Sequence, residues 1–300
     1  MAKCVVLAYH NIGRTGIEAL LNSGYEISAV FTHRDNPNEN IWFDSVAEFA
    51  TSKGIPVFAP ESVNHPIWIN RIRAMQPDFL FSFYYRDMVC QELLDVPAKG
   101  ALNLHGSLLP KYRGSAPYQW AVLNGEKETG VTAQHMVLKM DAGDIIDVEK
   151  TPIGPDETAG ELLDRLAVLG AGLLSRTLKS FENGTVCRIS QNEAEATFAP
   201  MLDKSMCPID WTKSAQAVHD QVRGLHPWPV ATMELQGKKF KVHETRVVSG
   251  SGKPGEILGL TKTGLVIACG EGAVEIRSLQ AEGGKRMAAP DYFRGHPLEL

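Results

Sequence analysis

The chain has 300 residues, of which 44% are hydrophobic and 22% charged, and its formal net charge is −5. This length favours two domains, and the composition is ordinary for a globular protein, with no sign of general disorder. A negative net charge does not attract nucleic acid, which is itself negatively charged. The sequence has no run of 18 or more apolar residues, so a membrane-spanning helix is not expected. No signal-like apolar segment opens the chain, so we expect a cytoplasmic protein. The scattered cysteines and histidines show no metal-ligand spacing, so neither a metal site nor a disulfide framework is expected.

Strand-like and helix-like segments alternate through the first 110 residues. The pattern predicts helices at 12–24, 45–54 and 66–75, and strands at 3–10, 25–33, 55–60, 78–85 and 101–107. This alternation is typical of βαβ units that build a parallel sheet, and hence of an α/β domain. Ligands bind outside the carboxyl ends of the strands in such sheets. Asn103 and His105, at the end of the last of these strands, therefore lie where chemistry is expected.

The remainder of the chain predicts two further strands, a long helix and a small β domain. Strands at 130–137 and 144–153 flank the turn "DAGD", and a well-capped helix follows at 158–184. The polar, irregular stretch 185–209 indicates a linker. A helix is predicted at 210–229, and the short strands and glycine turns after it are typical of a small antiparallel barrel. The expected domains are therefore 1–184 and 210–300.

Three polar residues are the candidates for catalysis: Asn103, His105 and Asp141. A histidine exchanges protons near neutral pH, and an asparagine amide can donate a hydrogen bond to a developing oxyanion. Asp141, in the turn "MDAGDII", would orient His105 and stabilise its protonated form. Each residue also has a purely structural interpretation, as a satisfied histidine or as a turn-forming Asn or Asp. Ser107 does not lie in a G-x-S-x-G elbow, so serine-hydrolase chemistry is not expected.

Two longer motifs resemble a known family. "NLHGSLLPKYRGSAP" and "ETGVTAQHMVLKMDAGDII" resemble the formyltransferases that use 10-formyltetrahydrofolate, in the order Asn-x-His, Ser-Leu-Leu-Pro, Gly-Val-Thr and Asp-x-Gly-x-Ile-Ile. "HPWPVA" and "SLQAEGGKRM" resemble the smaller C-terminal domain of the methionyl-tRNA formyltransferases and their relatives. The resemblance implies a Rossmann-like, mostly parallel catalytic domain, a smaller OB-like β-barrel domain and a reaction without a metal.

The same resemblance implies roles for individual residues. His105 would be the general acid/base, Asn103 would stabilise the oxyanion, and Asp141 would support the protonated His105. The folate would lie against two segments, composed of Asp87, Met88 and Val89 and of Val137, Leu138, Lys139 and Met140. The amine substrate is expected to contact Tyr9, Tyr112 and Arg113.

Two acceptors compete within this family: an amino sugar on a nucleotide and the methionine amine of initiator tRNA. The tRNA enzymes resemble one another in a long basic insertion after the second strand, which attracts phosphates. The stretch 32–45 instead carries Arg34 against three acidic residues, Asp35, Glu39 and Asp44. "GYEISAVFTHRDNP" and "FSFYYR" resemble the polymyxin-resistance enzymes that formylate UDP-4-amino-4-deoxy-L-arabinose for lipid A modification. We therefore expect a sugar-nucleotide acceptor, with tRNA as the alternative.

Some features depart from the amino-sugar pattern. "SLQAEGGKRM" is more similar to the tRNA enzymes, and Ser115 stands where the amino-sugar enzymes have an arginine. The sequence ends at Leu300, so we expect another protein to supply the decarboxylation that the bifunctional relatives also perform. A folate- or nucleotide-binding module without catalysis is a further alternative, against which the intact Asn103, His105 and Asp141 argue.

Overall fold

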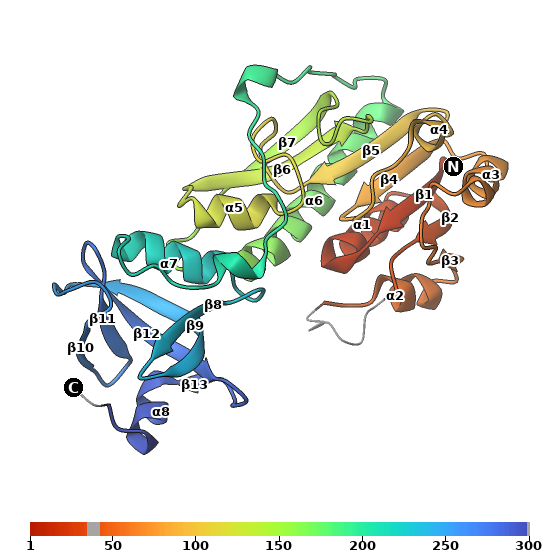
Figure 1. Ribbon diagram of the computed structural model, residues 1–300. Helices are drawn as coiled ribbons and strands as arrows, with labels where there is room; N and C mark the ends of the chain where they lie inside the picture. Colours follow the sequence, from red (N-terminus) through yellow and green to blue (C-terminus); the bar gives the residue numbers. More distant parts are fainter. Residues whose placement is uncertain (35–42, 299–300) are drawn as a thin grey trace. The chain divides into compact units, whose positions relative to one another are not determined.

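The computed structural model describes residues 1–34 and 43–298, which form two compact units (Figure 1). Unit 1 comprises residues 1–117, 129–151 and 163–199, and unit 2 comprises the rest of the described chain. Within these described ranges, no helix combines the length and the apolar character that crossing a membrane requires.

The unit boundaries differ from the predicted domains in two ways. Residues 118–128 and 152–162 group with unit 2 although they precede the expected linker. Hydrogen bonds connect both stretches to the rest of unit 2, because Trp120 Nε1 donates to Pro200 O at 2.8 Å and the guanidinium of Arg223 donates to Glu157 O at 3.0 Å. In contrast, residues up to Ala199 of the expected linker belong to unit 1.

A seven-stranded sheet forms the centre of unit 1, in the order β3-β2-β1-β4-β5-β6-β7. Strands β1 to β5 run parallel to one another, and β6 runs antiparallel to β5. The predicted α/β domain with a mostly parallel, Rossmann-like sheet is therefore confirmed. The strands are β1 (Lys3–Ala8), β2 (Glu26–Phe31), β3 (Val57–Phe58), β4 (Phe79–Phe83), β5 (Gly100–His105), β6 (Glu128–His135) and β7 (Ile145–Pro152).

The helices that connect these strands follow the predicted order (Figure 1). Ser45 begins α2 by accepting a hydrogen bond from Glu48 N, which is the arrangement expected of a serine N-cap. Two short helices, α4 and α5, were not predicted because neither is long enough to show a 3.6-residue apolar period. The elements are α1 (His10–Asn22), α2 (Val46–Ser52), α3 (Pro66–Ala74), α4 (Gln91–Leu94), α5 (Pro117–Leu123) and α6 (Ala159–Glu182).

One face of the sheet is apolar at the beginning of β5 and polar at its end. On one face, Leu80 of β4 and Ala101 of β5 pack in a buried cluster with Ile69 and Ile72 of α3. Because side chains alternate along a strand, Asn103 and His105 continue the Ala101 face towards the carboxyl end of β5. The apolar side chains of α3 therefore cover this face at the beginning of β5. The polar side chains of Asn103 and His105 occupy the same face at the end of the strand.

Unit 2 contains a smaller antiparallel sheet in the order β10-β11-β12-β9-β8, with β13 paired to β12. This confirms the predicted smaller β domain. Helix α7 (Ala215–Gly224) is shorter than predicted because Ser214 caps its start by accepting from Ala217 N. The strands are β8 (Ala231–Leu235), β9 (Lys238–Val248), β10 (Ile257–Leu260), β11 (Leu265–Ala268), β12 (Ala273–Ala281) and β13 (Met287–Ala288), followed by helix α8 (Ala289–Gly295).

Candidate active site

Asn103 and His105 lie on the same face of β5, which is flanked by β4 and β6. The register pairs Asn103 with Gln134 of β6 and His105 with Thr132, so all four side chains share this face. His105 is 6% exposed, and its ring is therefore positioned by protein atoms rather than by solvent. This placement agrees with the rule that ligands bind at the carboxyl ends of parallel strands.

Asp141 joins these residues from the turn after β6. Its Oδ1 accepts hydrogen bonds from Gln134 Nε2 at 2.9 Å and from Asn103 Nδ2 at 3.4 Å. The same oxygen lies 3.5 Å from Nδ1 of His105, and Oδ2 accepts from the backbone N–H of Gly114 at 2.9 Å. The three predicted catalytic residues therefore form one group, in which the carboxylate contacts both of the others.

The hydrogen bonds of His105 indicate which ring nitrogen can accept a proton. Its Nε2 lies 2.8 Å from the backbone carbonyl oxygen of Tyr112. Because a carbonyl oxygen only accepts, Nε2 must carry a hydrogen. In the neutral ring, Nδ1 is then the basic nitrogen, and it lies beside Asp141. A proton taken up at Nδ1 would form an imidazolium next to a carboxylate, which is a favourable contact in a largely buried site.

The loop between β5 and α5 provides Tyr112 and Gly114. Thr132 of β6 anchors the start of the loop, because its hydroxyl donates to Ser107 O at 2.7 Å and accepts from Leu109 N at 3.2 Å. Gly114 has a φ of +121°, and a Cβ at this position would lie 2.7 Å from the carbonyl oxygen of Ala199. A glycine is therefore needed for the backbone N–H at 114 to reach Asp141.

The residues predicted to contact the amine substrate occupy different surroundings. Tyr9 is 1% exposed, and its ring packs edge-on against His33 with the guanidinium of Arg86 4.5 Å from the ring centre. Tyr112 holds His105 through its backbone carbonyl. The side chain of Arg113 is fully buried and donates to other protein side chains instead of facing an open cavity. Substrate contacts by these residues stay predictions.

The residues predicted to contact folate include several exposed apolar side chains. Met88 lies after β4 and is 47% exposed, and Leu138 lies after β6 and is 54% exposed. Val137 and Met140 are similarly exposed, whereas Val89 is buried in the core. Asn64 holds the backbone here, since its amide donates to Met88 O at 2.7 Å and accepts from Cys90 N at 2.9 Å. Exposed apolar groups of this kind suit the flat face of an aromatic ligand.

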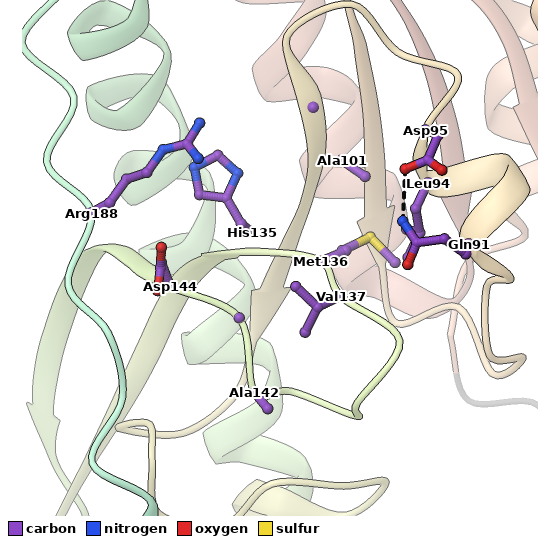
Figure 2. Close-up of a pocket in the computed structure, with 12 residues that line it drawn as sticks. Gln91, Leu94, Asp95, Ala101, His135, Met136, Val137, Ala142, Asp144 and Arg188 are labelled. Carbon is purple, nitrogen blue, oxygen red and sulfur yellow. Dashed lines mark hydrogen bonds between the residues drawn. The ribbon is translucent and has the colours of Figure 1, made fainter.

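A pocket of about 330 Å³ lies beside the end of β6 (Figure 2). His135 and Arg188 lie on one side of it, and the hydrogen-bonded pair Gln91 and Asp95 lies on the other. Burial, together with the nearby positive charge of Arg188, lowers the pKa of His135 to about 4. Asn103, His105 and Asp141 are not among the residues that line this pocket.

Some groups that hold Asp141 have no local signal in the sequence. Gln134 can be identified only after the strands are paired, because it lies opposite Asn103. Gln191 donates to the backbone of Asp141 at 2.8 Å from within the predicted linker. Across the described ranges, no group of three or more His, Cys, Asp or Glu side chains is arranged to hold a metal ion.

Comparison with known proteins identifies relatives for both units. A family model described as "Formyl transferase" matches residues 2–178, and one described as "Formyl transferase, C-terminal domain" matches residues 201–297. An N-formyltransferase from Helicobacter canadensis, solved with folinic acid and dTDP-3-aminofucose, is 21% identical at a TM-score of 0.71, over 92% of this chain and 99% of that one. HypX from Aquifex aeolicus, solved with tetrahydrofolic acid, is 19% identical at a TM-score of 0.67, over 97% of this chain and 46% of that one. A 4-N formyltransferase from Francisella tularensis is 20% identical at a TM-score of 0.64, over 79% of this chain and 95% of that one.

Proposed function

Because this chain belongs to the formyl transferase family, we propose that it transfers a formyl group from 10-formyltetrahydrofolate to the amine of a nucleotide-linked amino sugar. The observation that carries this proposal is the convergence of Asn103, His105 and Asp141 at the carboxyl end of β5. Formyl transfer needs a donor for the developing oxyanion and a group that moves protons, and this site offers both.

The bound folate would supply the formyl carbon, and the side chains of the site would manage charge and protons. His105 Nδ1 accepts the proton that the attacking amine loses, and it returns a proton to the nitrogen that leaves the formyl carbon. Asn103 Nδ2 has two hydrogens, one directed at Asp141 and one left for the formyl oxygen as that atom becomes negative. Asp141 stabilises the imidazolium that forms in between. This scheme requires no protein nucleophile.

The folate donor is supported by the exposed apolar side chains near the site. We assign its ring system to the segment 87–89 and the segment 137–140, which carry Met88, Val137, Leu138 and Met140. An aromatic ring placed against them would remove apolar area from water at roughly 25 cal/mol per Å². Asp87, Val89 and Lys139 belong to the same segments and are proposed as backbone contacts.

The sugar-nucleotide acceptor is supported by the charge of the stretch 32–45. Arg34 and Asp44 are described, and Asp44 forms an ion pair with Arg14 of α1, which neutralises that cation as well. Asp35 and Glu39 lie outside the described residues. A stretch with this excess of acidic residues offers less attraction to the phosphates of a tRNA acceptor stem than a basic one does. The resemblance to the polymyxin-resistance enzymes favours UDP-4-amino-4-deoxy-L-arabinose, and hence lipid A modification, as the specific case.

The proposal is tested by giving the purified protein 10-formyltetrahydrofolate and following tetrahydrofolate release. Separate reactions contain UDP-4-amino-4-deoxy-L-arabinose, dTDP-linked 3-amino and 4-amino sugars, or initiator methionyl-tRNA. We expect turnover with a sugar nucleotide and none with the tRNA. Turnover with the tRNA alone would overturn the acceptor, and folate binding without turnover on any amine would indicate a binding module.

A further inference from the structure

A segment formed by residues 189–199, which we call the strap, holds both loops of the candidate site. Ile189 forms an antiparallel bridge with Ile145, and Phe198 forms a parallel bridge with Arg113. The backbone of Arg113 also donates to Thr197 O at 2.9 Å and accepts from Ala199 N at 2.7 Å. The strap therefore joins the loop after β5 to the start of β7, instead of acting as a free linker.

Gln191 is the strap residue that reaches Asp141. Its Nε2 donates to the backbone carbonyl of Asp141 at 2.8 Å and to that of Gly143 at 2.7 Å. Its Oε1 accepts from Nε and Nη2 of Arg113 at 3.1 and 2.8 Å. Because a guanidinium only donates and a backbone carbonyl only accepts, the two ends of the amide cannot be exchanged without losing these bonds.

Arg113 is itself held by a carboxylate. Its guanidinium is fully buried, and it donates to the two oxygens of Glu193 at 3.2 and 3.0 Å. Glu193 also pairs with Lys139, which lies two residues before Asp141. Hydrogen bonds from Arg113 and Lys139 lower the pKa of Glu193 to about 2, so this carboxylate is charged at neutral pH. A continuous chain of charged and amide groups thus connects the strap to the Asp141 turn.

The Asp141 turn needs such support because its backbone is strained. Asp141 has a φ of +50°, in the left-handed region that residues other than glycine rarely adopt. Strained conformations persist where surrounding contacts hold them, and Gln191 contacts two carbonyls of this turn. Without these contacts, relaxation of the turn would move the carboxylate away from His105.

We propose that Gln191 is a positioning residue for formyl transfer: its amide holds the turn that presents Asp141 to His105, and Arg113 sets the orientation of that amide. The inference rests on the proposed function of the site. It gives Arg113 a supporting role in place of the predicted contact with substrate.

The test compares Gln191→Glu with the wild-type protein. This change keeps the shape and the contact with Arg113, but it places an acceptor against two carbonyls. We expect kcat for formyl transfer to fall on the order of 10- to 100-fold, with KM for the folate nearly unchanged, because the bound donor is not touched. The shorter Gln191→Asn is the second variant, in case the first does not fold. Its amide is neutral but cannot reach both carbonyls.

A matched control is available in unit 2. Gln221 also donates through Nε2 to two backbone carbonyls, those of Met206 at 2.8 Å and Pro208 at 3.0 Å. Gln221→Glu should leave kcat within about twofold of wild type, since no site residue is affected. Equal loss of kcat in the two variants would mean that the effect is general destabilisation, and it would overturn the inference.

A double-mutant cycle separates positioning from other roles. In an Asp141→Asn background, Gln191→Glu should add less than about threefold, because the group that it positions is already impaired. A full additional loss in that background would show that Gln191 does not act through Asp141. A wild-type protein that transfers formyl, combined with a fully active Gln191→Glu, refutes the positioning role alone. A wild-type protein without formyl transfer refutes the proposed function instead.

Discussion

The Nε2 atom of His105 donates to the backbone carbonyl of Tyr112 at 2.8 Å, and this bond leaves Nδ1 of the ring facing Asp141. The loop that provides the carbonyl is in turn connected to Asp141, because Gly114 N donates to Oδ2 at 2.9 Å. One loop therefore sets both the tautomer of the histidine and the direction of the carboxylate.

Asp141→Asn should lower kcat on the order of 10²- to 10⁴-fold, because the neutral amide no longer stabilises an imidazolium at His105. The new amide hydrogens would also face donors, since Asn103, Gln134 and Gly114 all donate to this carboxylate. Steady-state kinetics with a saturating amine measure the effect. Asp164→Asn, which alters a carboxylate of α6 that accepts from Asn11, is the control and should keep full activity. Similar kcat values for both variants would contradict the role of Asp141.

Leu138→Ser should raise KM for 10-formyltetrahydrofolate by roughly 3- to 30-fold, because the ligand loses an apolar contact. Thermal stability should change little, since the side chain is already 54% exposed in the free protein. Val168→Ser changes a 69% exposed residue on α6 and serves as the control. An unchanged KM for Leu138→Ser would remove Leu138 from the folate site.

Two glycines should respond to alanine in opposite directions. Gly114→Ala places a Cβ 2.7 Å from a backbone carbonyl at a φ of +121°, and we expect a loss of about 2 kcal/mol or more in unfolding free energy. Gly172→Ala in α6 meets open space, so it should stabilise the protein by about 0.5–1 kcal/mol. Urea unfolding of both variants checks the pair. Stabilisation by Gly114→Ala would contradict the close approach of the loop and the strap.

Acid should destabilise the protein through two histidines that are buried or partly buried. Burial is the main cause that lowers the pKa of His10 and of His135 from 6.5 to about 4. Between these values the unfolded chain binds protons that the folded chain does not, so unfolding becomes easier as the pH falls. The stabilisation is complete above pH 6.5 and is lost progressively as the pH falls towards about 4. Melting temperatures of His135→Gln should therefore depend less on pH than those of wild type, and an identical pH dependence would refute this role of His135.

The three candidate catalytic residues can be found in the sequence because their signal is local. Asn103 and His105 follow a strand pattern to its end, and Asp141 lies in a recognisable turn. Gln134 requires the β5–β6 register, which cannot be derived from either strand by itself. Gln191 is 50 residues from Asp141 in a polar stretch that shows no periodicity, so the sequence indicates only a linker there. Contacts made by irregular backbone segments depend on tertiary packing. Secondary-structure propensity and hydrophobic periodicity do not predict such contacts.

The boundary between the two units also depends on tertiary contacts that the sequence pattern does not show. Residues 118–128 and 152–162 adjoin the elements of unit 1 in sequence, but several of their hydrogen bonds join them to the rest of unit 2, such as Trp120 Nε1 to Pro200 O and Gly160 N to His226 O. The long pattern of α6 was predicted to within two residues at each end, because its apolar period continues over many turns.

The central claim is that His105 moves protons in formyl transfer and does not serve to bind the donor. The most direct test measures His105→Ala in two ways: turnover with the amine acceptor that the wild type uses, and binding of folinic acid by calorimetry. We expect turnover to fall by about 10³-fold or more while the affinity for folinic acid changes by less than about threefold. Retained turnover would contradict the proton-transfer role, and a parallel loss of folinic acid binding would show that His105 acts by holding the ligand.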